Sequence, residues 1–237
     1  PLRDFADFDY LRSRCGKRMI KCKGNSVRDR SGRYLYVSDP MVQMPFSEYL
    51  ALIEEAECSG KNVAFYMGKN PLIKELPELV DDIDASEASP IKKFEMCFGE
   101  NTQKVHTYFG CGRNTTAIHW DPSENLAAVL YGKKTYWLFP PTDADCLYPT
   151  GMPSFANSGV PPFLQTDRMS SSERERWPLY KHAKPLRVDL AAGDMLYLPI
   201  FWWHCVTACT ERNMQVNWWC DMHPRKKVTS PATEGAR

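Results

Sequence analysis

Three residues of this chain have the types and spacing of metal ligands. His119 and Asp121 are separated by one residue, and His204 follows the apolar run GDMLYLPIFWW much later in the chain. Alternate residues of a β-strand point to one face, so a single strand can present His119 and Asp121 to the same point. Two imidazoles and one carboxylate that leave coordination positions open form the facial triad that binds non-haem Fe(II). The sequence therefore predicts an iron centre at His119, Asp121 and His204.

A lysine is the fourth candidate residue of the site. Lys134 lies fifteen residues after His119, on the second of two apolar strands, residues 126–131 and 134–139, that we expect to form a hairpin. A buried ammonium without a counter-charge is costly, so a lysine on an interior strand is a natural receptor for an anion. Lys133 should face outward. The competing interpretations are a surface His-Asp pair and a lysine whose charged end reaches solvent.

Two stretches carry a family resemblance. HWDPSENLAAVLYGKKTYWLFPP and GDMLYLPIFWWHCV resemble the two signature blocks of the Jumonji-C (cupin-like) 2-oxoglutarate oxygenases. Within that superfamily the chain is most similar to the small hydroxylase branch, which includes protein lysyl and asparaginyl hydroxylases and the tRNA wybutosine hydroxylase. The segment VNWWCDM is similar to the corresponding segment of the lysyl hydroxylases. The resemblance covers most of the chain.

The resemblance implies a double-stranded β-helix that uses Fe(II), 2-oxoglutarate and O2. In such proteins a lysine at the position of Lys134 pairs with the far carboxylate of 2-oxoglutarate. Tyr66 and Thr116 match positions whose hydroxyls also bond the cosubstrate, although a plain core or edge tyrosine is an equal alternative for Tyr66. Asn125 and Asn217 match positions where an amide lines the cosubstrate pocket or bonds near the iron.

The implied reaction is hydroxylation of an unactivated C–H bond, with release of succinate and CO2. The first candidate substrate is a protein side chain, with lysine favoured by the resemblance. A modified tRNA base is the second candidate, and demethylation of an N-methyl-lysine is the third. A metal-binding cupin scaffold without turnover is the non-enzymatic alternative.

Composition and charge exclude few classes of binding partner. The chain has 237 residues, 43% of them hydrophobic, and a formal net charge of +1, so no global field selects nucleic acid or a membrane. Nine Lys or Arg lie between Leu11 and Arg33 against one acid, and six acids lie between Glu75 and Glu87. We interpret both runs as solvated faces. A basic run that guides an acidic partner or RNA is the alternative.

Cysteine usage favours a reducing compartment. The nine cysteines are odd in number and form no CxxC pair, so buried thiols are preferred to disulfides. A metal site at Cys205, Cys209 and Cys220 is the alternative. No signal-peptide pattern or long apolar run occurs, which favours an intracellular protein, cytoplasmic and/or nuclear, with no membrane partner. Because the first residue is Pro1, a targeting segment could precede it.

The pattern of elements predicts a mainly β fold, a jelly roll or cupin with flanking N-terminal helices. We expect residues 1–93 to pack on the barrel, residues 94–223 to form it, residues 142–185 to be an insertion near its mouth, and residues 224–237 to be a polar tail. The tail leaves no room for the dimerising helices of several relatives, which favours a monomer or weak homodimer. Residues 45–57 should form a helix. Strands are expected at residues 34–37, 62–67, 105–109, 115–120, 126–131, 134–139, 186–190, 195–199, 203–209 and 214–219.

Overall fold

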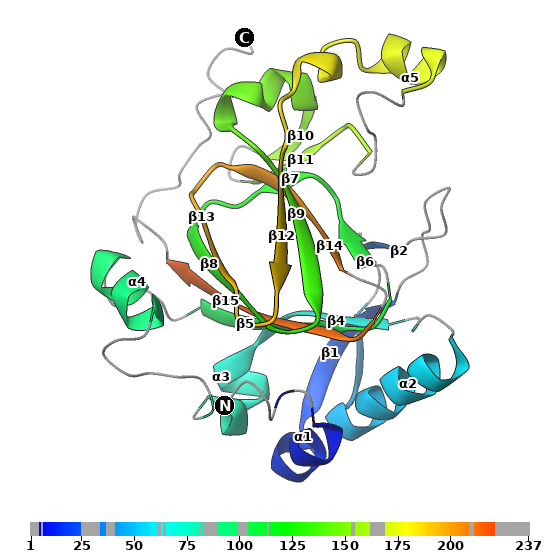
Figure 1. Cartoon of the computed structure of the whole chain (residues 1–237), viewed down its shortest axis with the longest axis vertical. Coiled ribbons are helices and arrows are strands. Elements are labelled where there is room, and N and C mark those ends of the chain that lie inside the picture. The colour runs from blue at the N-terminus through cyan, green and yellow to red at the C-terminus, as the bar shows by residue number, and fades with distance from the viewer. Residues whose placement is uncertain are drawn as a thin grey trace.

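Two β-sheets face each other and enclose the centre of the molecule (Figure 1). The expected mainly β fold, a double-stranded β-helix with flanking helices, is confirmed. In the part of the chain that can be described, no helix is long and apolar enough to cross a membrane. The computed structural model describes residues 5, 7–24, 34–36, 41–60, 63, 65–80, 82, 90–98, 104–112, 114–152, 155–161, 169–208 and 211–220.

The first sheet has seven strands in the order β13-β8-β15-β5-β4-β1-β3. Every residue of β15 is buried, because one face of the strand packs against helices and the other faces the second sheet. Strands β4, β1 and β3 from the N-terminal region extend this sheet beyond β5. The strands are β1 (Met19–Gly24), β3 (Met41–Pro45), β4 (Phe65–Pro71), β5 (Lys104–Gly110), β8 (Glu124–Tyr131), β13 (Met195–Leu198) and β15 (Asn213–Cys220).

The second sheet has eight strands and is built around β14, which pairs with β9 along one edge and with both β6 and β7 along the other. Strands β11 and β10 continue the sheet from β7, β2 continues it from β6, and β12 pairs with β9. The strands are β2 (Tyr34–Tyr36), β6 (Asn114–Thr116), β7 (His119–Trp120), β9 (Lys133–Phe139), β10 (Pro149–Met152), β11 (Phe155–Ser158), β12 (Leu186–Ala191) and β14 (Trp203–Ala208).

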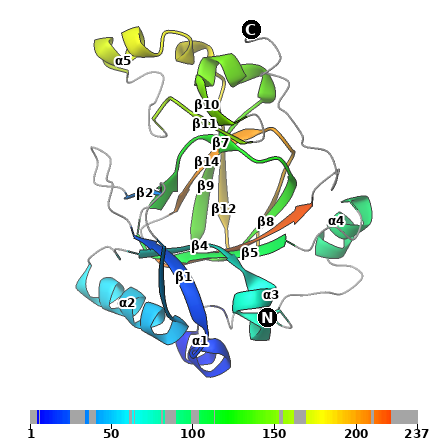
Figure 2. The same ribbon diagram turned by 180° about the vertical axis from the view of Figure 1, so that it is seen from behind.

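Helices cover the outer face of the first sheet, at the bottom of Figure 1 and again in Figure 2. In α2, Phe46, Tyr49, Leu50 and Ile53 recur at helical spacing and are all buried, and the helix ends at Gly60 in the left-handed conformation. The helices are α1 (Phe8–Cys15), α2 (Phe46–Ser59), α3 (Leu72–Glu75), α4 (Pro90–Phe98) and α5 (Ser171–Arg176), with 3-10 turns η2 (Pro77–Leu79), η3 (Pro141–Leu147) and η5 (Tyr180–His182).

The buried apolar side chains form three layers. The largest joins the first sheet to α1, α2 and α3, and the second packs η3 and η5 against the outer face of the second sheet. The third lies between the sheets, where Ala127 and Val129 of β8 meet Tyr136 and Leu138 of β9. The inner layer is small, and polar side chains occupy much of the remaining interior.

The expected hairpin at residues 126–139 is wrong. Strands β8 and β9 have the predicted bounds to within two residues, but β8 pairs with β13 and β15 while β9 pairs with β12 and β14. The chain turns the corner between the two sheets at Gly132, whose φ is +73°. A Cβ there would lie 2.4 Å from the carbonyl oxygen of Arg212, so only glycine fits this corner.

Two further strand expectations need adjustment, and the segment expected as an insertion contains secondary structure of its own. The strand expected at residues 62–67 begins at Phe65 and continues to Pro71. The strand expected at residues 115–120 is broken into β6 and β7. Residues 142–185 contain the paired strands β10 and β11 and the helix α5, which a capping box at Ser170 and Glu173 begins. The boundaries at residues 93 and 223 stay predictions.

Phe109 links the helices to the sheet, which generates a stability prediction. Its ring packs edge-to-face on Phe8, Phe46 and Tyr49, with ring centroids 5.9–6.1 Å apart, and the Tyr49 hydroxyl donates to its carbonyl oxygen. We expect Phe109→Ala to lower the free energy of unfolding by ~3–5 kcal/mol, measured by urea titration. The matched control is Ile73→Ala, which truncates a side chain that is 57% exposed. Equal losses in both variants would contradict the packing role of Phe109.

Candidate functional site

One extra residue in the segment from β6 to β7 determines how the candidate metal ligands are oriented. Along β14, Thr207 pairs with Thr115 of β6 and His204 pairs with His119 of β7. Three residues separate Thr115 from His119, but only two separate His204 from Thr207. The extra residue is a bulge, and it changes which side chains face inward. In an unbroken strand Thr116 and His119 would point to opposite faces, yet here both line the interior cavity.

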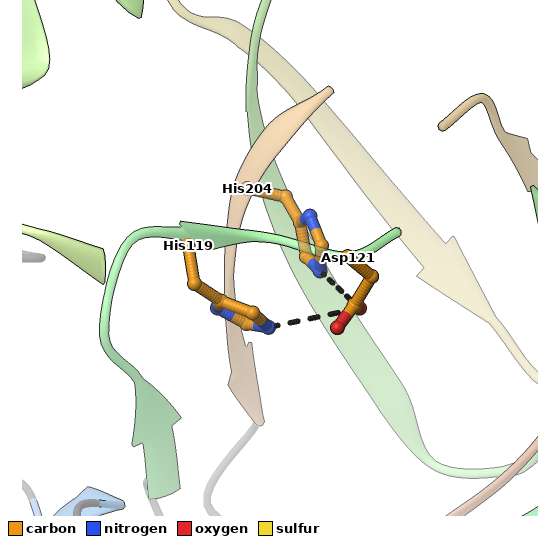
Figure 3. Close-up of side chains that lie close together, drawn as sticks. All are labelled: His119, Asp121 and His204. Carbon is orange, nitrogen blue, oxygen red and sulfur yellow. Dashed lines mark ion pairs between the residues drawn. The ribbon is translucent and has the colours of Figure 1, made fainter. Parts of the chain in front are cut away.

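The side chains of His119, Asp121 and His204 converge on one point (Figure 3). The Asp121 Oδ2 lies 3.9 Å from Nε2 of His119 and 3.6 Å from Nε2 of His204. One ligand atom from each residue lies within 4.8 Å of the others. The sequence predicts Asp121 on the same strand as His119, but β7 ends at Trp120 and Asp121 directly follows it. The Phe201 amide donates to the Asp121 carbonyl oxygen at 3.4 Å.

Backbone carbonyls set the ring orientation of both histidines. Nδ1 of His119 lies 2.8 Å from the carbonyl oxygen of Ala117, and Nδ1 of His204 lies 3.0 Å from that of Trp202. A proton on each Nδ1 satisfies these contacts and leaves the Nε2 lone pair directed at Asp121. Burial, and then the neighbouring His119, lower the pKa of His204 to about 4. His204 is therefore neutral at physiological pH, which is the form that binds metals.

The donor set fits a divalent transition metal with open coordination positions. Two imidazoles and one carboxylate approach from one side, and their side chains are between 5% and 19% exposed. This is the ligand set of non-haem Fe(II) centres, whereas structural zinc sites close a tetrahedron with four protein ligands. Among the residues whose placement is described, no other group of three histidine, cysteine or acidic side chains brings its ligand atoms within 4.8 Å of one another.

The three candidate ligands line a cavity of about 460 Å³ between the two sheets. All eight side chains that the sequence predicts for the site line it. Lys134 is 3% exposed, and its ammonium donates to the Tyr66 hydroxyl at 3.1 Å. No carboxylate of the described chain lies within ion-pair distance of this ammonium. Burying such a cation is costly, and an anionic ligand in the cavity would offset that cost by supplying the counter-charge.

A row of polar side chains continues from Lys134 along the cavity wall. The Tyr136 hydroxyl donates to Gln215 at 2.8 Å, Gln215 donates to Asn217 at 2.6 Å, and Asn217 donates to Asn125 at 2.9 Å. Burial keeps the Tyr136 hydroxyl protonated, because it raises the pKa well above its usual value. The chain of bonds fixes which amide atoms face the ligand space.

Sequence reasoning missed Tyr136 and Gln215, although a signal was available. Tyr136 lies two residues after Lys134, and Gln215 lies two residues before Asn217. The period of two in a β-strand puts each on the same face as its predicted neighbour. Thr116, which the resemblance implies bonds the cosubstrate, accepts a hydrogen bond from the Val206 amide at 2.9 Å. Its own hydroxyl proton can still be donated into the cavity.

The segment expected as an insertion also reaches this cavity. Asn157 of β11 pairs with His119 across the β7–β11 ladder, and directly paired residues present their side chains to the same face. Asn157 and Ser158 both line the cavity. Sequence reasoning placed residues 142–185 near the mouth of the barrel but singled out no residue there. Only the strand pairing identifies Asn157 as the neighbour of the candidate metal ligand His119.

The other predictions lie away from this site or outside the described residues. Lys133 is exposed, on the opposite face of β9 from Lys134. Cys205 and Cys220 are buried and form no disulfide with another described cysteine, and Cys209 lies outside the described residues. Residues 25–33 of the N-terminal basic run, residues 81 and 83–87 of the acidic run, and the whole polar tail also lie outside them.

Comparison with known proteins matches the cupin-like domain family over residues 3–226. Relatives include the JmjC domain-containing protein E of Dictyostelium discoideum (28% identical, 76% of this chain and 60% of that protein). A lysine-specific demethylase of Arabidopsis thaliana is 28% identical over 89% of this chain and 45% of its own. A bifunctional peptidase and (3S)-lysyl hydroxylase of Homo sapiens is 28% identical over 64% and 51%. The chain thus spans about half the length of these curated relatives.

Tyr66 reaches Lys134 only because residue 110 is glycine, which generates a second prediction. A Cβ on Gly110 would lie 2.6 Å from Cδ2 of the Tyr66 ring. We expect Gly110→Ala to displace the ring and lower the free energy of unfolding by ~1–3 kcal/mol in thermal or urea unfolding.

A double-mutant cycle separates this clash from other effects of the added methyl group. In a Tyr66→Ala background the cost of Gly110→Ala should largely disappear, because the ring that it meets is gone. Gly24→Ala is the control, since a Cβ at Gly24 would meet nothing within 4 Å. An unchanged cost in the Tyr66→Ala background would show that the ring is not the obstacle.

Proposed function

The chain belongs to the cupin-like, Jumonji-C family, and from this premise we propose that it is a 2-oxoglutarate- and Fe(II)-dependent oxygenase that hydroxylates a protein side chain. One observation carries the proposal. A set of two imidazoles and a carboxylate shares a single cavity with Lys134, a buried cation for which no described carboxylate lies within ion-pair distance. A metal centre and an anion receptor in one cavity match a cosubstrate that chelates metal at one end and carries a carboxylate at the other.

Each group of the site has a distinct role in this proposal. His119, Asp121 and His204 would hold the metal and leave its remaining positions open. Lys134 and Tyr66 would bind the far carboxylate of 2-oxoglutarate and so fix which end of the molecule meets the metal. When bound, Fe(II) with 2-oxoglutarate and O2 supplies an oxidant that hydroxylates an unactivated C–H bond, releasing succinate and CO2. Thr116, Asn125 and Asn217 would orient the cosubstrate by hydrogen bonds.

The choice of a protein side chain rests on two of the relatives. One is named as a lysine-specific demethylase and another as a (3S)-lysyl hydroxylase, and lysine is therefore our first candidate target. The two names describe different outcomes at a lysine. Mass spectrometry distinguishes them, because C–H hydroxylation adds about 16 Da to the product whereas removal of an N-methyl group subtracts about 14 Da.

Two alternatives remain distinguishable by simple measurements. A modified tRNA base as the substrate predicts binding that weakens steeply with salt, since phosphate contacts release counterions. If the protein is a metal-binding scaffold, metal and 2-oxoglutarate should bind, but no turnover should be detected with any substrate. We expect a monomer or weak homodimer.

The metal ligands generate a third prediction. With Fe(II) and ascorbate, the wild-type protein should form succinate from 2-oxoglutarate, and Asp121→Ala and His119→Ala should abolish this reaction because each removes a ligand. Asp145→Ala, which changes an exposed acid outside the cavity, is the control. Thermal unfolding of each variant checks that the fold persists. Retained turnover in Asp121→Ala would exclude the proposed metal site.

Lys134 generates a fourth prediction. Lys134→Ala should raise the 2-oxoglutarate concentration needed for half-maximal turnover about ten- to hundredfold, because a charge-assisted contact of ~1.5–3 kcal/mol is lost. Metal affinity, followed by titration, should change little. Lys133→Ala removes the neighbouring exposed lysine and should leave both quantities unchanged. If Lys134→Ala and Lys133→Ala behave alike, the lysine is structural.

A further inference from the structure

A second lysine reaches the cavity through an irregularity in β4. The pairing of β4 with β5 joins Met67 to Phe109 and resumes at Asn70 with Thr107. Two residues of β4, Gly68 and Lys69, therefore lie opposite the single residue Tyr108. Such a bulge re-aims the side chains that it contains, and bulges are common beside functional sites.

The backbone of this bulge is strained at Lys69. Its φ is +58°, the left-handed region that side chains other than glycine rarely adopt. The strain is held by Asn70, which is 1% exposed and whose side chain accepts from the Lys21 amide at 2.9 Å and donates to the Lys21 carbonyl oxygen at 2.8 Å. A costly conformation that the surroundings enforce at a cavity is an observation that points to function.

The ammonium of Lys69 lies 4.4 Å from the ring centroid of Trp219. Both residues line the cavity, and Lys69 is exposed whereas Trp219 is 8% exposed. Lys69 thus lies at the rim, with its charge held over an aromatic wall by a cation–π contact. No carboxylate of the described residues forms an ion pair with it.

The net charge of the cavity with Fe(II) and 2-oxoglutarate bound, which rests on the proposed function, determines which charge the rim presents to a substrate. The positive charges of Fe(II) and Lys134 would be balanced by Asp121 and by the two carboxylates of 2-oxoglutarate. Of the two other lysines that line the cavity, Lys23 and Lys69, the exposed Lys69 would then place a positive charge where the substrate enters. A rim charge of one sign favours a partner that carries the opposite charge.

We propose that Lys69 and Trp219 form a rim subsite that recognises a carboxylate side chain in the protein substrate, close to the residue that is hydroxylated. A protein is favoured over RNA because base recognition uses exposed aromatic faces on which bases stack. The ring of Trp219 is instead contacted by Lys69 and by the His106 ring, whose centroid lies 5.1 Å away. The substrate class is therefore an acidic protein segment.

A binding selection tests this inference without turnover. A random peptide pool is equilibrated with the immobilised protein in the presence of 2-oxoglutarate and without added iron, and the bound peptides are sequenced. We expect Asp and Glu to be enriched about two- to fivefold over Asn and Gln, the range expected for one exposed charge pair. The enrichment should fall as salt is raised, because an exposed pair is screened.

Variants of Lys69 assign the preference to this residue. Lys69→Met should remove the acidic enrichment, Lys69→Glu should reverse it towards Lys and Arg, and Lys69→Arg should retain it. Lys69→Gly also removes the side chain, and because glycine tolerates the positive φ, its loss of enrichment cannot come from backbone strain. Lys133→Met, at an exposed lysine outside the cavity, should bind like the wild type.

The outcomes separate this inference from the proposed oxygenase activity. Absent acidic enrichment, or equal enrichment in wild type and Lys69→Met, overturns the subsite even if succinate is formed. Enrichment that depends on Lys69 supports the subsite even if no turnover is found. A random RNA pool that displaces the peptides and loses affinity in Lys69→Met would identify a nucleic-acid site and overturn the protein assignment.

Discussion

One extra residue in the strand segment before the candidate metal centre sets the geometry on which the rest of the site depends. Between Thr115 and His119 the chain carries one residue more than its partner β14 does between His204 and Thr207. The bulge lets Thr116 and His119 face the same cavity, and it leaves the two histidines paired across the ladder with their ring centroids 4.3 Å apart. A regular strand would have sent one of these side chains to the outer face of the sheet.

Polar groups in the space between the sheets are stable because they bond to one another. The hydroxyl of Tyr136 begins a chain of amides that ends at Asn125, and both histidine rings are held by backbone carbonyls. Each bond offsets the cost of removing a polar group from water. Lys134 is the exception, since only a tyrosine hydroxyl bonds its charge within the described residues. An anionic ligand beside Lys134 would supply the counter-charge that the described side chains do not.

Two side chains that line the cavity take positions that a regular sheet would not give them. A bulge is responsible in one case and a glycine in the other. The bulge at Lys69 re-aims a rim lysine, and Gly110 leaves space for the Tyr66 ring. Around these positions, clusters of buried apolar side chains cover the outer faces of both sheets. A preformed ligand site needs such packed layers around it, because they hold the irregular and strained residues that line the cavity in place.

The sequence by itself determined the residue types of the candidate site, the mainly β fold and most strand bounds. Alternation with a period of two and the spacing of His119, Asp121, Lys134 and His204 are local properties, and they can be read without a partner strand. Strand pairing was decided only by the tertiary structure. Residues 126–139 fit a hairpin locally, yet β8 and β9 enter different sheets, because each strand pairs with strands distant in the chain. The bulges, and with them the side-chain directions of Thr116 and Lys69, arise from register between such strands. Register is a relation between two segments, so no single segment specifies it.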